Sequence, residues 1–164
     1  MRATDNDGMV PQHSYALIPF RRKAGGIEVL IGHMGGPFWA RKDVGAWSFP
    51  KGLPEATDSD GLAAACREFY EELGLEAPTD GFIELGDIKQ SGGKVVTGWA
   101  VEADPNLADF SPGAFSLEWP PRSGQIQDFP EIDRIAWASP DEAQRLLVTA
   151  QREFVLRLLQ IVSR

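Results

Sequence analysis

One feature of the chain constrains its fold most, a predicted amphipathic helix in the second half of residues 52–75. An α-helix turns about 100° per residue, so Glu71 and Glu72 fall within roughly 60° of Glu68 on its surface. The apolar side chains gather on a separate stripe, which is the face that a helix buries. This stripe contains Leu62, Cys66, Phe69 and Leu73. The core side and the acidic side of the helix are therefore cleanly separated.

The acidic face is unfavourable for the helix by itself. Like charges four residues apart destabilise a helix by roughly a few tenths of a kcal/mol. Gly74 is expected to end the helix, so Glu71 and Glu72 lie in the last turn, where the helix dipole disfavours anions. A divalent cation would reverse this penalty, because Mg²⁺ and Mn²⁺ prefer hard oxygen ligands. Spacing alone leaves two interpretations open, a solvated acidic face and a metal site.

The residues around the helix carry a specific motif. Residues 67–75 read Arg67-Glu-Phe-Tyr-Glu-Glu-Leu-Gly-Leu75. They match every specified position in the second half of the Nudix signature, and residues 49–52 resemble the segment that leads into it. The chain therefore resembles the Nudix hydrolases, in particular small bacterial nucleoside triphosphate pyrophosphohydrolases and diadenosine polyphosphate hydrolases. The resemblance implies an α/β (α+β) fold, a Nudix-type α/β/α sandwich with a mixed β-sheet.

The first half of the signature departs from the family pattern. Gly52 lies one residue too far from Arg67, so the intervening loop carries an insertion. The first glutamate of the signature has no clean equivalent, because counting back from Arg67 gives Ser59 and counting forward from Gly52 gives Asp58. Either Ser59 or Asp60 could act as the N-cap of the helix. The insertion leaves the three helical glutamates unaffected.

The resemblance also assigns roles within the motif. It implies that Glu68 and Glu72 bind Mg²⁺ or Mn²⁺ directly. Glu71 is expected to be a third ligand or to orient metal-bound water, and the carbonyl group of Gly52 to add a backbone ligand. Arg67 is expected to hold the carboxylates in place. Together these five residues form the predicted catalytic and metal-binding set.

Two carboxylates outside the motif are candidates for a further ligand or base. Glu131 precedes a predicted strand at residues 132–137 and is the first candidate, and Glu118 is the second. Lys51 and Arg41 are candidates to bind substrate phosphates, although an ordinary solvated charge is the slightly favoured interpretation of Arg41.

A long segment, residues 104–129, is rich in proline and glycine and predicts a loop without regular structure. Within it, Trp119 and Arg122 could stack on a base and pair with a phosphate. The alternative for Trp119 is packing on the core. Neither His13 nor His33 forms a metal-ligand pattern with nearby residues.

Hydrophobic patterning predicts strands, a helix, further strands and a final helix, which gives a mixed sheet with helices on both faces. Ser139-Pro140-Asp141-Glu142 has the composition of a helix start. The predicted elements are a hairpin of 14–21 with 27–33, a short strand at 47–49, a hairpin of 82–89 with 94–102, and a helix at 151–162.

The whole chain limits the class of protein. Its 164 residues correspond to about one domain, predicted over residues 13–164 after a flexible tail at residues 1–12. The net charge of -8 argues against nucleic acid or an anionic membrane as a partner. The single cysteine cannot form an intrachain disulfide, which favours a cytoplasmic setting. Five tryptophans are explained equally well by core packing or by a homodimer contact.

The leading hypothesis is a metal-dependent Nudix pyrophosphohydrolase. It would cleave a diphosphate linkage of a dinucleoside polyphosphate or a nucleoside triphosphate by attack of water at phosphorus. The rival is a Nudix-fold module that binds a nucleotide for regulation without hydrolysis. The intact glutamates and Arg67 favour the enzyme, whereas the altered loop keeps the rival open. A purely structural metal site is weaker, because one helix leaves coordination positions open.

Overall fold

The computed structural model describes residues 12–162, and residues 1–11 of the predicted tail lie outside the described residues. The strands are β2 (His13–Lys23), β3 (Gly26–Met34), β4 (Trp47–Ser48), β5 (Lys51–Gly52), β6 (Ile83–Lys89), β7 (Val95–Glu102), β8 (Ala114–Glu118), β9 (Ile126–Pro130) and β10 (Ile132–Ala138). The helices are α1 (Gly61–Leu73), α2 (Pro140–Leu146) and α3 (Arg152–Val162), with short 3₁₀ turns η2 (Ser91–Gly93), η3 (Leu107–Asp109) and η4 (Thr149–Gln151).

The main sheet is mixed, as expected. Its central strands follow the order β10-β3-β2-β7-β6, with β4 paired to β3 and β5 paired to β2. Strands β2 and β7 are parallel, and the other neighbours are antiparallel. Both predicted hairpins, β2 with β3 and β6 with β7, are confirmed.

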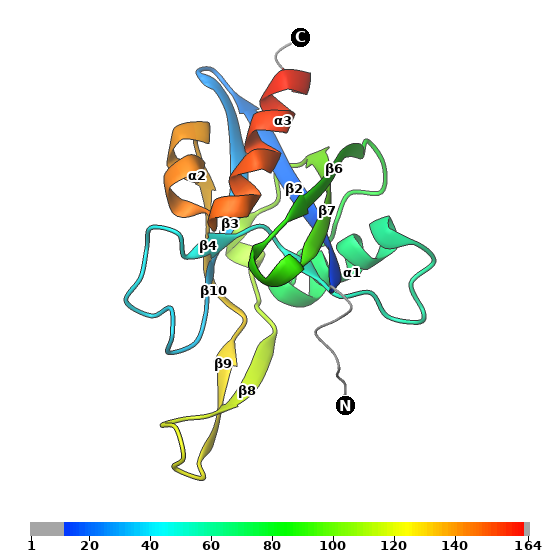
Figure 1. Ribbon diagram of the computed structural model, residues 1–164. Coiled ribbons are helices and arrows are strands. Elements are labelled where there is room, and N and C mark those ends of the chain that lie inside the picture. Colours follow the sequence, from blue (N-terminus) through cyan, green and yellow to red (C-terminus); the bar gives the residue numbers. More distant parts are fainter. Residues whose placement is uncertain (1–11, 163–164) are drawn as a thin grey trace.

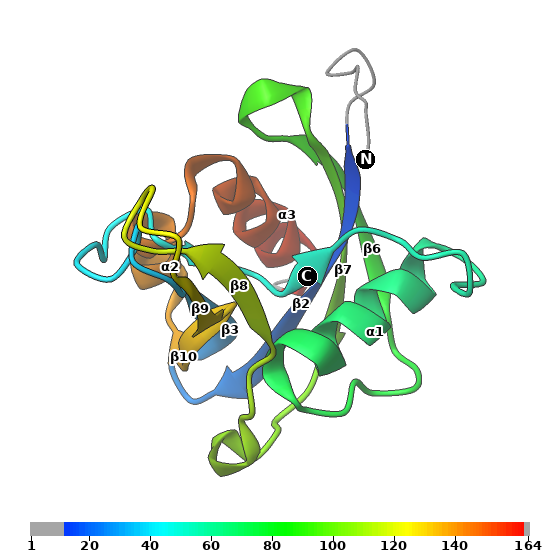
Figure 2. The same ribbon diagram turned by 90° about the horizontal axis from the view of Figure 1, so that it is seen from below.

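Helices cover both faces of this sheet (Figures 1 and 2), with α1 on one side and α2 and α3 on the other. The alternation of side chains along β2 explains the two layers. Leu17 belongs to the core on the α1 side, with Phe69 and Leu73. Ile18 belongs to the core on the other side, with Phe154. The predicted α/β/α sandwich is therefore confirmed.

Local signals explain where the helices begin and end. The side chain of Asp60 accepts a hydrogen bond from the backbone N–H of Ala63 at 2.8 Å, so Asp60, and not Ser59, caps α1. Gly74 ends α1 in the left-handed conformation, with φ of 70°. Ser139 forms the predicted capping box at the start of α2. None of the helices within residues 12–162 combines the length and the apolar character needed to cross a membrane.

The predicted long loop at residues 104–129 is wrong. Within it, β8 and β9 pair as an antiparallel hairpin that extends away from the sandwich (Figure 1). Only alternate residues of β8, such as Phe115 and Leu117, are half-buried. This alternation is the signal for a strand, but it is short and flanked by prolines and glycines.

A buried glutamine connects three segments of the core. Gln151 is 1% exposed, and its side-chain oxygen accepts the backbone N–H of Phe49 at 2.8 Å. Its amide nitrogen donates to Ser48 Oγ and to Gln90 Oε1, each at 3.0 Å. The network joins the turn η4, which immediately precedes α3, to the strand that leads into the motif and to the β6–β7 turn.

We predict that Gln151→Ala lowers the free energy of unfolding by about 1–3 kcal/mol, because it leaves the buried Phe49 N–H without a partner. Urea denaturation monitored by tryptophan fluorescence measures this change. The matched control is Gln160→Ala, an exposed glutamine on α3, the helix that directly follows Gln151. Equal losses for the two variants would contradict the role assigned to the buried amide.

Candidate metal-binding active site

The strand β5 brings its backbone against the acidic face of α1. The backbone N–H of Lys51 donates to Glu72 Oε1 at 3.3 Å. A Cβ atom on Gly52 would overlap the carboxylate of Glu68. Only glycine therefore permits this approach, and the requirement explains the Lys51-Gly52 pair immediately before the loop of the motif.

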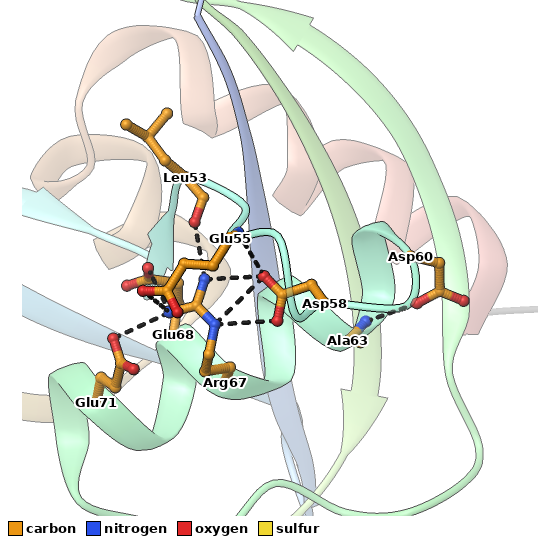
Figure 3. Close-up of polar contacts among 8 residues, drawn as sticks. All are labelled: Leu53, Glu55, Asp58, Asp60, Ala63, Arg67, Glu68 and Glu71. Atoms are coloured by element: carbon orange, nitrogen blue, oxygen red, sulfur yellow. Dashed lines mark hydrogen bonds and ion pairs between the residues drawn. The ribbon is translucent and has the colours of Figure 1, made fainter.

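Arg67 lies at the centre of an ion-pair network (Figure 3). Its Nη1 atom donates to Glu68 Oε2 at 3.1 Å and to Glu71 Oε1 at 3.0 Å. Its Nη2 atom donates to the carbonyl oxygen of Leu53 at 2.8 Å. Arg67 thus ties two glutamates of the helix to the loop that precedes the helix, as the resemblance implied.

The carboxylate of Asp58 is the strongest partner of Arg67. Arg67 Nε and Nη2 each donate to it at 3.0 Å, one to each oxygen, in a two-point interaction (Figure 3). These hydrogen bonds lower the pKa of Asp58 and raise the pKa of Arg67. The open choice between Ser59 and Asp58 is therefore resolved in favour of Asp58, the residue reached by counting forward from Gly52.

A cavity of about 380 Å³ opens beside this network. Glu68 and Glu72 reach it from α1, and Glu131 reaches it from the residue before β10. The backbone of Glu131 is fixed on both sides, since its N–H donates to Gly113 and its carbonyl accepts from Gly35, each at 2.9 Å. Two elements far apart in the sequence thus present carboxylates to one space.

The carboxylates are electrostatically strained in this cavity. Burial raises the pKa of Glu72 to about 8, and repulsion from Glu131 adds to the effect. Burial also raises the pKa of Glu68, although Arg67 opposes the shift. The pKa of Glu131 is raised by burial and by the charge of Glu71. Simultaneous ionisation of these three carboxylates is therefore unfavourable in the metal-free site.

The donor set fits a hard divalent cation. Carboxylate oxygens are the ligands that Mg²⁺ and Mn²⁺ prefer, and the raised pKa values, caused mainly by burial, mean that a bound cation would favour the ionised form of these groups. Within residues 12–162 no three carboxylate, histidine or cysteine side chains lie together so that they could hold a metal ion by themselves. Backbone, substrate and solvent oxygens would therefore have to complete the coordination of a cation bound by these glutamates.

The predicted phosphate-binding residues divide into two groups. Lys51 lines the cavity, and its burial lowers the pKa of its ammonium group. Arg41 is exposed in the loop between β3 and β4 and does not line the cavity. Trp119 and Arg122 lie at the tip of the β8–β9 hairpin, also away from the cavity. The ring of Trp119 packs edge-on against the exposed Phe38, 5.3 Å between centroids, rather than on the core.

Of the two candidate acids outside the motif, only Glu131 reaches the cavity. Glu131 lines the cavity, whereas Glu118 Oε2 accepts the backbone N–H of Gly124 at 2.8 Å within the hairpin tip. Sequence reasoning missed Gln90 and Lys94, which line the same cavity. Their position at the β6–β7 turn was predicted, but no sequence pattern shows that this turn faces the acidic helix.

We predict that Asp58→Asn lowers the melting temperature and that Ser59→Ala does not. Because Arg67 lowers the pKa of Asp58, its stabilising effect is present above the usual pKa of aspartate. The effect disappears as the pH falls through the lowered pKa of the folded protein. Thermal unfolding of both variants at neutral and acidic pH measures this difference. A larger loss in Ser59→Ala would overturn the assignment of Asp58.

Comparison with known proteins places this geometry in a family. The NUDIX domain model matches residues 11–158 of the chain. No curated protein sequence matches it. Among solved structures, a C. elegans Ap4A hydrolase in a binary complex has a TM-score of 0.60 at 19% identity, covering 93% of this chain and 98% of its own.

Two further structures share the fold. The NUDIX domain of Shewanella oneidensis NrtR, complexed with ADP ribose, has a TM-score of 0.62 at 13% identity, covering 93% of this chain and 89% of its own. The Nudix hydrolase RenU from M. smegmatis has a TM-score of 0.53 at 19% identity, with coverages of 93% and 86%. At such identities the likeness concerns the fold, whereas the family match spans most of the sequence. The chain belongs to the NUDIX domain family and is a Nudix hydrolase, an enzyme that acts on phosphoric anhydride bonds.

Proposed function

We propose that this Nudix hydrolase is a metal-dependent pyrophosphohydrolase of nucleoside polyphosphates. The observation that carries the proposal is the convergence of Glu68, Glu72 and Glu131 on one open cavity, where burial and mutual repulsion raise their pKa values. Such a site gains stability by binding a cation. An acidic protein of this kind also needs cations between itself and an anionic substrate.

Each carboxylate of the site has a separate proposed role. Glu68 and Glu72, with the carbonyl group of Gly52, are proposed to bind Mg²⁺ or Mn²⁺. Glu131 faces them from the other wall and is proposed as a further ligand or as the base that accepts a proton from the attacking water. Glu71 is 48% exposed and paired with Arg67, which suits a residue that orients water at the rim.

The remaining groups position the substrate and the ligands. When bound, the cation would offset the charge of the diphosphate and lower the pKa of water. Arg67 keeps the carboxylates of Glu68 and Glu71 in place through hydrogen bonds to both. Lys51 and Lys94 line the same cavity and provide positive charge for phosphate oxygens. Cleavage then follows when water attacks phosphorus and the phosphate leaving group departs.

The substrate class rests on the chain's resemblance to its structural relatives. One relative is an Ap4A hydrolase, which supports a dinucleoside polyphosphate or a nucleoside triphosphate. Another is the NrtR domain complexed with ADP ribose, which keeps the alternative of a nucleotide-binding module without hydrolysis. The intact carboxylates and the two-point pair of Asp58 with Arg67 favour hydrolysis, because the altered loop still supports the motif.

In a panel of diadenosine polyphosphates, nucleoside triphosphates, nucleotide sugars and diphosphoinositols, we predict turnover of the diadenosine polyphosphates or the nucleoside triphosphates, and only when Mg²⁺ or Mn²⁺ is present. Glu72→Gln is expected to lower kcat/KM by at least about 100-fold, since loss of groups that merely support metal ligands already costs about 10–100-fold. Assays of phosphate and nucleotide release measure the turnover and the change in kcat/KM. The matched control is Glu76→Gln, an exposed carboxylate just beyond α1. Nucleotide binding without any cleavage would favour the regulatory module instead.

In the metal-free protein, we predict that stability falls as the pH rises from the ordinary glutamate range to about 8, the pKa of buried Glu72. The unfolded chain releases this proton at a lower pH than the folded protein does, so folding is favoured below this window. With chelator at higher pH, Glu72→Gln should melt above wild type by about 3 °C or more. Differential scanning fluorimetry across pH tests this, and Mg²⁺ should reverse the order. A variant that melts below wild type under chelator would contradict the electrostatic account.

A further inference from the structure

A second cavity, of about 800 Å³, borders the carboxylate cavity. The two share three lining residues, namely Lys51, Gln90 and Lys94. The larger cavity continues past them to Lys89 and to the side chain of Trp39 in the loop between β3 and β4. A ligand that starts at the carboxylates therefore has a continuous path into a larger space.

The charge of this second cavity is opposite to that of the protein. The chain has a net charge of -8, yet three lysines and no aspartate or glutamate line the cavity. Within residues 12–162, no carboxylate forms an ion pair with Lys89 or Lys94. These ammonium groups therefore have their charge available for an anionic ligand.

A hydrogen bond from the buried side chain of Gln151 holds Gln90 at the junction of the two cavities. Gln90 Oε1 accepts a hydrogen bond at 3.0 Å from Gln151, whose side chain is 1% exposed. This contact fixes the amide of Gln90 from the core side. Its NH₂ group is left as a donor, which suits an anion and not a cation. The amide of Gln90 and the two flanking lysines thus all favour an anionic ligand.

We propose that the second cavity, bounded by Lys51, Lys89, Gln90 and Lys94, binds the distal phosphates of a linear chain of three or more phosphates. This inference rests on the proposed function, since it names the substrate class of that site. The reactive diphosphate lies at the carboxylates, and the following phosphates extend along the lysines. A substrate with only two phosphates, such as ADP-ribose, leaves Lys89, which lines only the second cavity, without a partner, so the cavity selects for chain length.

The test measures binding without turnover. Isothermal titration calorimetry with Ca²⁺ in place of Mg²⁺ compares inorganic tripolyphosphate with pyrophosphate for wild type and for Lys89→Gln, which changes a lysine that lines only the second cavity. Wild type should bind tripolyphosphate more tightly, and Lys89→Gln should lose about tenfold of that affinity while changing little for pyrophosphate. The control, Lys23→Gln, removes a lysine charge from the β2–β3 turn and should leave both affinities unchanged.

Three results would overturn the proposal: no preference of wild type for tripolyphosphate, no change in Lys89→Gln, or an equal loss in the control variant. A second readout uses Mg²⁺ and compares kcat/KM for diadenosine tetraphosphate and for ADP-ribose. Lys89→Gln should lower kcat/KM for diadenosine tetraphosphate more than for ADP-ribose. The calorimetry needs no catalysis. Selective tripolyphosphate binding, combined with no turnover of the nucleotide panel in Mg²⁺, would therefore refute the proposed hydrolysis and leave this inference standing.

Discussion

The arrangement of the site depends on one interaction, the pairing of Arg67 with Asp58. Arg67 holds α1 and the loop before it in a fixed relation through hydrogen bonds to Asp58 and to the carbonyl group of Leu53. The same guanidinium orients Glu68 and Glu71. Because this loop follows Gly52, whose backbone approaches Glu68, the pair also sets the distance between β5 and the acidic face. The one-residue insertion is thus accommodated without loss of the network.

The second constraint is the burial of carboxylates that repel one another. Glu72 and Glu131 come from separate elements and face one cavity, where burial raises the pKa of both. A chain selected for stability alone would not place them there. A bound cation would remove the repulsion between these carboxylates. The stability that the metal-free protein loses to this repulsion then contributes to its affinity for the metal. The neighbouring lysine-lined cavity gives an anionic substrate the complementary charge on its other side.

Much of the fold could be predicted because its signals are local. Asp60, Gly74 and Ser139 mark helix ends, and apolar runs mark both large hairpins. The β8–β9 hairpin was missed because the alternation around Phe115 is short. The motif predicted the glutamates on the acidic face of α1. The other residues of the site come together only through the fold. Sequence spacing could not choose Asp58, nor show that Gln90 and Lys94 meet the helix from a distant turn.

The most direct test of the central claim is anomalous diffraction from crystals soaked in Mn²⁺. The account predicts a manganese peak in the cavity, within bonding distance of Glu68, Glu72 and the carbonyl oxygen of Gly52, with Arg67 still paired to Asp58. The peak should disappear in Glu72→Gln. A peak elsewhere on the acidic surface, or a cavity without manganese under saturating conditions, would contradict the assignment of these residues to the metal.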